Sequence, residues 1–463
     1  MEDFFSPVML SRLQFAVTTL FHILWPLLSV GLSLFMVITE AAWLKTGNEL
    51  YYRHTRFWAK LFLLSFGLGV ASGLPLEFEF GTNWARFSRF SGGFFGNILG
   101  FEGAMAFMLE AAFFGVSMFA WNRVSRRVHL FATAMVAAGA SLSAFWIMDA
   151  NAWMQTPAGV AVQSGQIVVT DYAKAIFNPA WFYSFSHMWV ACVETSLFFV
   201  AGISAWYLRK DRHREFFLKS FKTSVAAAVI VAPLQVYLGD LSARGVAIYQ
   251  PAKTAAMEAH WQTNPPGQGA GWIVVAWPDE PNQKNVWELR IPYLLSLLIY
   301  HTPTAQVQGL RDIPPQDRPP VLIPFYSFRL MTAIGLYLAA LVLWALWKWR
   351  RGQLRAESLW TGRGFWLAWV WAAPLGFIAS DLGWATREVG RQPWVVQGLL
   401  RTSDGVSTLS RSPTAATLAL YTGIYLLLLV LFVVFTRRIL QKGPDLTSPL
   451  PARQPEAQEG TPA

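Results

Sequence analysis

Residues 15–44 read FAVTTLFHILWPLLSVGLSLFMVITEAAWL and form an apolar stretch with almost no charged side chains. About 20 such residues are enough for one helix to cross the hydrocarbon core of a bilayer. The stretch begins too late and runs too long to be a cleaved signal peptide, and no small-residue cleavage site follows a short apolar core. We therefore expect a retained transmembrane helix here.

Further apolar stretches of this kind recur along the chain. Together they predict an all-α polytopic membrane protein, a bundle of about nine transmembrane helices. The further stretches are residues 57–76, 98–121, 130–153, 181–208, 220–237, 325–347, 365–384 and 415–435. The composition agrees, because 54% of the residues are hydrophobic and only 14% are charged, whereas about a quarter are charged in soluble domains. An ordinary soluble enzyme is therefore excluded.

Every second apolar stretch is followed by a cluster of Lys and Arg residues. The clusters come after residues 15–44, 98–121, 181–208, 325–347 and 415–435. Lys and Arg accumulate in short loops on the cytoplasmic side of a membrane, so we expect the N-terminus outside and the C-terminus in the cytoplasm. The net charge of +10 then reports the topology, and we expect no nucleic-acid partner.

Two segments without membrane character divide the chain. Residues 1–239 contain the first six predicted helices, and residues 324–442 contain the last three. Between them, residues 240–323 are polar and rich in Pro and Gly, and the topology places them on the outer, periplasmic side. Loops of that length are usually functional or disordered. Residues 443–463, with several prolines and dispersed charge, are predicted to be a disordered cytoplasmic tail.

Five of the ionisable residues within the apolar stretches attract attention: His22, Glu102, Glu110, His187 and Asp381. A charge at the bilayer centre costs about 3 kcal/mol on insertion scales, so such residues are functional candidates by default. In the predicted topology all of them except Glu110 lie in the outer half of the membrane. Glu110 follows Glu102 by close to two helical turns, on the same face and about 12 Å deeper. Such a pair suits proton passage, and the alternative is that each carboxylate only hydrogen-bonds a neighbouring helix.

The chain has a single cysteine, Cys192. It excludes an internal disulfide framework and a cysteine-ligated iron–sulfur cluster. Any metal must therefore be held by His, Met or carboxylate side chains. Three histidines, His54, His129 and His213, lie among the basic loops, where we expect them to be solvated.

Two histidines at one depth, His22 and His187, indicate haem ligation by imidazole. A low-spin haem takes two axial ligands, for which His and Met are a common pair. Met331 lies at the depth of His187 on another predicted helix, although a lone Met is more often part of the core.

Several sequence blocks resemble the catalytic subunit (subunit I) of the cytochrome bd family of quinol oxidases, in order and spacing, over nearly the whole length. The blocks are Ser11-Arg12-Leu13-Gln14-Phe15 followed by His22, Gly81-Thr82-Asn83-Trp84, residues 102–110, Trp153-Met154-Gln155, Phe328-Arg329-Leu330-Met331 and Gly390-Arg391-Gln392-Pro393-Trp394. The resemblance implies a multi-pass, haem-containing terminal oxidase of the bacterial cytoplasmic (inner) membrane. Such an enzyme oxidises quinol at the outer face and reduces O2 to water with cytoplasmic protons, which generates a proton motive force without pumping.

The resemblance also implies roles for residues in the predicted membrane helices. His187 and Met331 match the axial ligands of a low-spin haem b, and Arg329 lies two residues from that Met. His22 matches an axial ligand of one high-spin haem. Glu102 matches a residue at the other high-spin haem, as an iron ligand or on the proton path to it, and Glu110 lies deeper on that path.

Further roles fall on the outer side. Lys253 and Glu258, in the motif QPAKTAAME, match residues of the loop that binds and oxidises quinol. Arg391 matches a residue that can pair bidentately with haem propionates, in the same motif as Trp394, and its alternative is a surface charge.

Two features depart from the better-known members of the family. The outer loop is short and resembles the cyanide-insensitive branch. Asp381 stands where those members carry a Glu near a high-spin haem, and its shorter side chain favours a hydrogen-bonding or proton-handling role over iron ligation. The implied cofactors are a low-spin haem b, a high-spin haem b, and haem d or a further haem b in its place. The implied partners are subunit II, a small single-helix subunit, quinol, O2 and the lipid bilayer.

The competing hypothesis is a secondary transporter, whose intramembrane carboxylates bind a substrate or coupling ions near the midplane. Transporters of this kind usually contain internal repeats and paired broken helices, and neither is evident in the sequence. The outer level of the titratable residues also favours the oxidase. A reduced spectrum with b-type bands would distinguish the two hypotheses.

Overall fold

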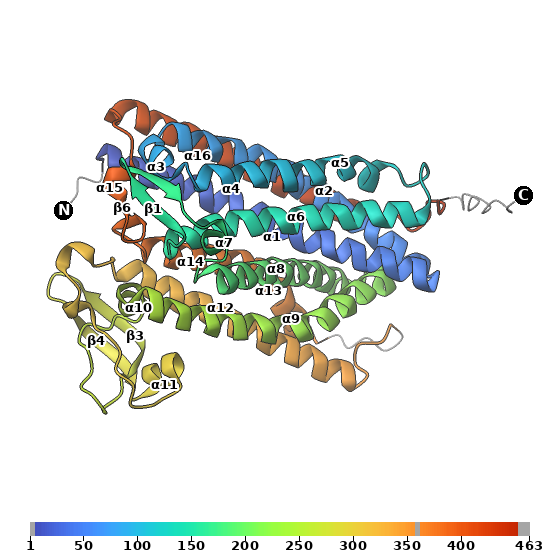
Figure 1. The fold of residues 1–463 in the computed structure, drawn as a ribbon. Coiled ribbons are helices and arrows are strands. Elements are labelled where there is room, and N and C mark those ends of the chain that lie inside the picture. Colours follow the sequence, from blue (N-terminus) through green and yellow to red (C-terminus); the bar gives the residue numbers. More distant parts are fainter. Residues whose placement is uncertain (1–4, 357–361, 452–463) are drawn as a thin grey trace, which may run out of the picture.

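The computed structural model describes residues 5–356 and 362–451. Within that part of the chain, 9 helical spans are long and apolar enough to cross a membrane, and they lie side by side in one elongated bundle (Figure 1). The spans are Pro7–Thr46 (α1), Glu49–Gly81 (α2), Phe95–Phe119 (α4 to α5), Arg126–Gln155 (α6), Trp181–Arg209 (α8), Arg214–Tyr249 (α9), Leu322–Arg350 (α12), Arg363–Val389 (α13 and α14) and Arg411–Lys442 (α16). The predicted class, an all-α polytopic membrane protein, is confirmed.

Two of the spans are not regular α-helices. In the first, α4 (Phe95–Phe101) and α5 (Met108–Phe119) are joined by a π-helical turn, η1 (Glu102–Phe107). Such turns occur mostly at functional sites. The other span breaks between α13 (Arg363–Ala372) and α14 (Leu375–Val389). The break falls at a proline, which has no N–H to donate to the preceding turn.

The remaining elements are short and gather at one end of the bundle, which we call the hairpin end (Figure 1). They include the helices α3 (Ala85–Ser91), α7 (Tyr172–Ile176), α10 (Pro251–Met257), α11 (Leu294–Tyr300) and α15 (Thr402–Gly405), and the 3-10 turns η2 (Leu310–Asp312) and η3 (Pro315–Asp317). Three antiparallel pairs of strands complete them: β1 (Val160–Gln163) with β2 (Gln166–Val169), β3 (Trp272–Asp279) with β4 (Lys284–Ile291), and β5 (Trp394–Val396) with β6 (Leu400–Arg401).

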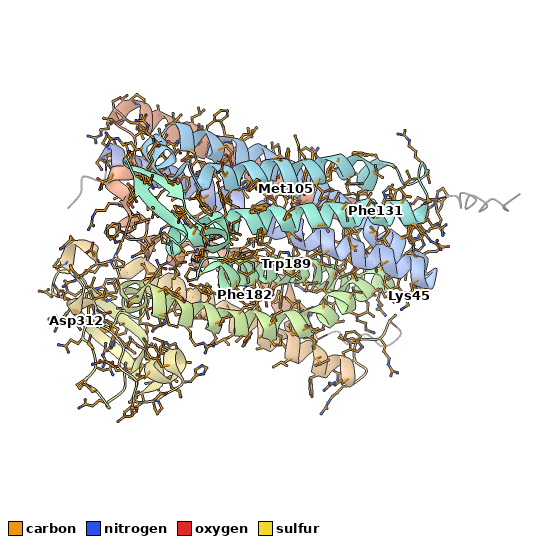
Figure 2. All side chains as sticks on the ribbon, viewed as in Figure 1. Lys45, Met105, Phe131, Phe182, Trp189 and Asp312 are labelled. Carbon is orange, nitrogen blue, oxygen red and sulfur yellow. The ribbon has the colours of Figure 1, made fainter. Side chains whose placement is uncertain are left out.

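The opposite end carries the basic loops and is called the basic-loop end. Figure 2 labels Lys45 at this end, Asp312 at the hairpin end, and Met105, Phe131 and Phe182 between them. Those three apolar side chains are exposed. A helical bundle with an apolar flank between two polar ends is what a bilayer requires, because helices satisfy their own backbone groups.

The largest buried hydrophobic cluster of the described residues lies toward the basic-loop end. Its centre is a buried aromatic cluster that includes Trp58, Phe62, Tyr207, Phe217 and Trp369. These residues come from helix segments next to the basic loops. The ionisable residues predicted for the site lie on the hairpin side of this cluster, since α1, α8 and α12 begin at the hairpin end and carry their predicted ligands early.

The loop between α9 and α12 is shorter than the sequence predicted. Helix α9 continues to Tyr249, beyond the boundary expected at residue 239. One reason is an ion pair between Asp240 and Arg244, 3.2 Å apart at helical spacing, which favours helix in this segment. The loop that follows is folded around the β3–β4 hairpin, where Ile273 and Leu310 belong to a buried cluster that also includes Phe325 of α12.

Part of the predicted disordered tail packs on the bundle. Leu450 packs against the aromatic cluster of Trp43, Tyr52 and Trp121, and Arg126 donates a hydrogen bond to the carbonyl of Pro451. Backbone carbonyls therefore find donors among the basic side chains of this end. The rest of that tail, residues 452–463, lies outside the described residues.

The expectation that His54 and His129 are solvated was wrong. Both residues are buried, because α2 and α6 begin before them and carry them into the bundle. One ring nitrogen of His54 hydrogen-bonds the carbonyl of Phe216 at 2.9 Å, and His129 pairs with Glu40.

Candidate functional site

His22 on α1 is oriented by hydrogen bonds from α2. Its Nδ1 lies 3.0 Å from Ser72 Oγ, and Ser72 Oγ donates to the carbonyl of Gly69 at 3.1 Å. Because the serine uses its only proton on Gly69, the imidazole must donate from Nδ1, which leaves Nε2 as a lone-pair donor. This arrangement is typical of metal-binding histidines. A Cβ at Gly73 would lie 3.1 Å from Cε1 of the ring, so the glycine lets the imidazole lie against the backbone of α2.

His187 on α8 has a similar setting. Its Nδ1 is buried and makes no hydrogen bond to any described residue. Gly239 on α9 faces the ring, where a Cβ would lie 3.4 Å from Cε1. A buried imidazole nitrogen without a partner is costly unless a ligand or a metal completes it, so His187 fits the predicted role of an iron ligand.

Met331 on α12 faces a third glycine. A Cβ at Gly383 on α14 would lie 2.9 Å from its Sδ, closer than side chains approach. Asp381 lies two residues earlier on the same helix, and its Oδ1 is buried without a hydrogen bond within the described chain. Glycines beside His22, His187 and Met331 thus let each predicted ligand lie directly against the backbone of a neighbouring helix.

Helix α14 shows that His187 and Met331 lie at one depth. Arg387 donates to Ser184 Oγ at 3.1 Å, and Thr386 hydrogen-bonds Ser327 at 2.8 Å. Ser184 is one helical turn before His187 on α8, and Ser327 is one turn before Met331 on α12. Thr386 and Arg387, which are neighbours on α14, thus hold α12 and α8 at the same level. Met331 and His187 come one turn later on these two helices, on the two sides of α14.

Glu102 and Glu110 both face α6, as predicted from their spacing. Glu102 accepts a hydrogen bond of 2.5 Å from Ser143 Oγ. Gly139, one turn away on α6, lies against Glu110, and a Cβ there would be 3.0 Å from the glutamate Cβ. The π-helical turn begins at Glu102 and changes the direction of the side chains that follow, yet both residues contact the same helix.

Lys253 lies on α10 but does not project into the loop. It is 3% exposed, and its Nζ donates to Gln155 Oε1 at 2.6 Å and to Gln250 Oε1 at 3.0 Å. Burial lowers the pKa of Lys253 well below its ordinary value, with Arg387 and Arg391 acting in the same direction and Glu388 against it. The lysine therefore belongs to a buried charged cluster.

Glu388 is the only carboxylate among the charged residues just named. It accepts hydrogen bonds from Asn151 at 2.9 Å, from Gln155 at 3.3 Å and from Arg391 Nη2. Arg391 is 4% exposed, and its Nε and Nη1 atoms are buried without partners in the described chain. Three basic side chains around one carboxylate, with unused guanidinium donors, form a site for an anion such as a haem propionate. The alternative that Arg391 is a surface charge is excluded by its burial.

Glu258 and Arg329 form a buried ion pair. Arg329 Nη2 lies 2.5 Å from Glu258 Oε2, and the guanidinium also donates to the carbonyl of Ile273 at 2.7 and 2.9 Å. Burial raises the pKa of Glu258, and the charge of Arg329 opposes that effect. The pair ties the outer loop to α12 two residues before Met331.

Trp394 lies in β5, with the guanidinium of Arg401 at 4.3 Å over its ring.

A separate pocket of about 610 Å³ opens beside α10, and its lining includes Ile248, Thr254, Tyr300 and Asp312. The hydroxyl of Thr254, next to Lys253, is buried without a partner in the described chain.

The sequence did not identify several residues of the site. The charged cluster is anchored by Arg387, Glu388 and Asn151. The presence of three charged residues within 387–391 could have indicated it. Two buried carboxylates, Asp149 and Glu194, were also missed, because one charge hardly changes the mean hydropathy of a span. Among the described residues, no group of three or more His, Cys, Asp and Glu side chains could hold a bare metal ion, whereas haem iron needs only axial ligands from protein.

The bundle and the residues near its hairpin end define the chain as a polytopic membrane protein with candidate haem ligands on separate helices. Residues 10–444 match the family model described as cytochrome bd terminal oxidase subunit I. The chain belongs to this family, as the resemblance implied. It is a multi-pass protein of the bacterial cytoplasmic membrane.

Individual relatives agree. The chain is 34% identical to cytochrome bd-II ubiquinol oxidase subunit 1 of Escherichia coli, over 97% of this chain and 99% of that protein. It is 35% identical to cytochrome bd ubiquinol oxidase subunit 1 of Bacillus subtilis, over 95% of each. Among solved structures, it is similar to bd oxidase from Geobacillus thermodenitrificans, with a TM-score of 0.86 and 32% identity over 95% of this chain and 99% of that one.

Proposed function

We propose that the chain is the haem-bearing catalytic subunit of a quinol oxidase, which takes electrons from quinol at the hairpin end and reduces O2 to water with protons from the basic-loop end. The observation that carries the proposal is the placement of His187 and Met331 at one depth on the two sides of α14, beside a buried cationic cluster. The E. coli and B. subtilis relatives, both named as ubiquinol oxidase subunits, support the choice of substrate.

Three sets of residues fit haem. His187 and Met331 would hold a low-spin haem b, His22 would hold a high-spin haem b, and Glu102 would serve haem d or a further haem b. Arg391, with two unused donors, would pair with propionates. When bound, haem supplies one-electron redox chemistry and the site of O2 reduction. The chain orients the imidazoles, leaves glycines opposite each ligand and neutralises the anionic groups.

The pocket beside α10 is the candidate for the quinol head group. Its lining includes Thr254 and the carboxylate of Asp312, next to the exposed apolar side chain of Ile248. Lys253 and Glu258 lie buried behind this surface and not on it. Their role is to join the quinol loop to the ligand-bearing helices, Lys253 through Gln155 of α6 and Glu258 through Arg329 of α12.

Protons for O2 reduction would reach the site along the α5–α6 contact, where Glu110 and Glu102 both face α6. Asp381, with its unpartnered Oδ1, is placed to hold a proton near the ligands. The basic loops support a cytoplasmic location of this end, in which case each turnover would move charge across the membrane without a pump. Family membership favours this function over the secondary transporter.

As a subunit I, the chain assembles with a subunit II, and we extend the proposal to a small single-helix subunit. The short loop between α9 and α12 further suggests cyanide-insensitive turnover, as in the branch that it resembles.

A spectrum of the purified oxidase tests the proposal directly. The reduced-minus-oxidised difference spectrum should contain b-type bands, and the protein should consume O2 with quinol as donor. Pyridine haemochrome extracts would show whether haem d accompanies haem b. Protein without haem bands and without quinol-dependent O2 consumption would refute the assignment.

Two glycine variants should differ in their effect on the low-spin haem. In Gly383→Ala the new Cβ would lie 2.9 Å from Met331 Sδ, so the methionine must move and the low-spin band should shift or weaken. In Gly239→Ala the new Cβ would make ordinary contact with His187 at 3.4 Å, and the band should stay close to wild type. Reduced-minus-oxidised difference spectra of the two variants check this expectation. Equal spectra would show that Gly383 does not border a ligand.

A further inference from the structure

A second group of buried titratable residues lies at the basic-loop end, far along the helices from the predicted ligands. Glu40 on α1 is 0% exposed and His129 on α6 is 2% exposed. Glu40 Oε1 lies 2.6 Å from His129 Nδ1. Both side chains lie inside spans, where a charged group is costly unless it has a function or a partner.

Hydroxyl groups extend this pair into the bundle. Thr133, one turn after His129 on α6, donates to the other oxygen of Glu40, Oε2, at 2.8 Å. The hydroxyl of Ser117 on α5 lies 3.1 Å from the hydroxyl of Thr133. All four side chains are buried, so a continuous hydrogen-bonded row runs from His129 to the α5–α6 contact.

The row is aligned with the two carboxylates already described. Ser117 and Glu110 are seven residues apart on α5, two turns that place them on one face. On α6, Thr133 faces Ser117, Gly139 faces Glu110, and Ser143 binds Glu102. About 10 Å of helix rise separates Ser117 from Glu110, an interval that the glutamate side chain and one or two bridging waters can span.

On the side of the basic loops, one nitrogen of the pair has no hydrogen-bond partner among the described residues. His129 Nε2 is buried and makes no hydrogen bond within the described residues. The ring packs against Trp121, with the two ring centroids 3.8 Å apart, and the guanidinium of Arg56 lies over that same indole at 5.3 Å, next to the basic loops. A pair that only held α1 against α6 would need neither the unpartnered Nε2 of His129 nor the hydroxyl groups of Thr133 and Ser117.

We propose that Glu40 and His129 form the inner mouth of the proton route to Glu110 and Glu102. His129 takes a proton at Nε2 and releases the one on Nδ1 to Glu40 Oε1. Glu40, now protonated on Oε1, turns its carboxyl group about the Cγ–Cδ bond and presents the protonated oxygen to Thr133. Thr133 accepts this proton as it gives its own to Ser117, and Ser117 gives one onward, so Glu40 is again a carboxylate and charge and atoms balance. The inference rests on the proposed oxidase function, because it assigns the source of the protons used in O2 reduction.

The test uses the assembled oxidase in proteoliposomes, with Glu40→Gln, Glu40→Asp and the control His54→Gln. His54 is also a buried histidine at the basic-loop end, but its bonded nitrogen contacts only a backbone carbonyl. Turnover per haem, the KM for quinol and proton uptake are measured for each variant. In Glu40→Gln we expect turnover and proton uptake to fall about tenfold or more, while the haem bands and the KM for quinol are retained. Glu40→Asp should recover turnover and uptake. His54→Gln should give wild-type values.

Other outcomes overturn the inference. Wild-type turnover per haem in Glu40→Gln would show that protons do not pass this residue. Loss of haem bands in both Glu40 variants, with turnover per remaining haem unchanged, would mean that Glu40 only holds α1 on α6. If wild-type protein itself lacks haem and quinol oxidase activity, the proposed function fails, and that failure is visible before any variant is compared.

Discussion

Replacement of His187 by alanine should remove the low-spin haem band and lower quinol oxidase turnover by about a hundredfold or more. In our assignment the imidazole is one of two axial ligands. Its Nδ1 is buried and has no hydrogen-bond partner in the described chain. A low-spin haem depends on both axial ligands, so Met331→Ala should give the same spectral loss. Difference spectra at equal protein concentration, with a pyridine haemochrome assay of haem content, measure the effect.

Met188→Ala is the matched control for this experiment. Met188 follows His187 on α8, but its sulfur lies 3.4 Å from Cys192 on the same helix. The control should retain the low-spin band, because its side chain packs against the cluster of Leu27, Ala144 and Cys192. An unchanged low-spin band in His187→Ala would contradict the ligand assignment, whatever the activity of the variant.

The second large effect is expected at Glu258. Glu258→Gln leaves Arg329 buried without its carboxylate, and the loss of one partner of a buried ion pair costs about 3–5 kcal/mol. We expect a clearly lower Tm and a large fall in quinol oxidation, because this pair fixes the quinol loop against α12. Thermal unfolding followed by haem absorbance, together with steady-state oxidation of quinol, measures both effects.

The neighbouring pair of Glu288 and Arg290 provides the control. Its atoms are 2.6 Å apart, but the arginine side chain is 48% exposed. Exposed pairs contribute about 0–1 kcal/mol, so Glu288→Gln should hardly change Tm. The double variant Glu258→Gln/Arg329→Met removes the unpaired charge and should regain much of the stability. Equal Tm values for Glu258→Gln and Glu288→Gln would show that the buried pair does not hold the loop.

The membrane spans could be predicted from the sequence because the requirement is local. About 20 apolar residues cross a bilayer whatever lies beside them, so the stretch that includes His22 could be recognised without its neighbours. The helical spacing of Glu102 and Glu110 was informative for the same reason, and both carboxylates do face one helix. The extension of α9 to Tyr249 was missed, because the charged residues Asp240 and Arg244 interrupt the apolar run, whereas in the helix they form an ion pair.

The partners of the charged residues could not be predicted in this way. Lys253 was matched to the loop that binds quinol, and the structure buries it against Gln155 of α6. His129 was expected in solvent, and it is paired with Glu40 of α1. These pairs join residues about 90 to 100 positions apart along the chain, and the rotation and crossing of packed helices decide them.

The sequence by itself determined the helical membrane class, the positions of the spans and the residue types available to hold haem, because hydropathy and side-chain chemistry belong to short segments. Only the tertiary structure decided that α14 holds His187 and Met331 at one depth, that Arg391 keeps unused donors in a buried cluster, and that Glu40 begins a hydrogen-bonded row toward Glu110. Each of these depends on which faces of distant helices meet, and that is set by the packing of the whole bundle.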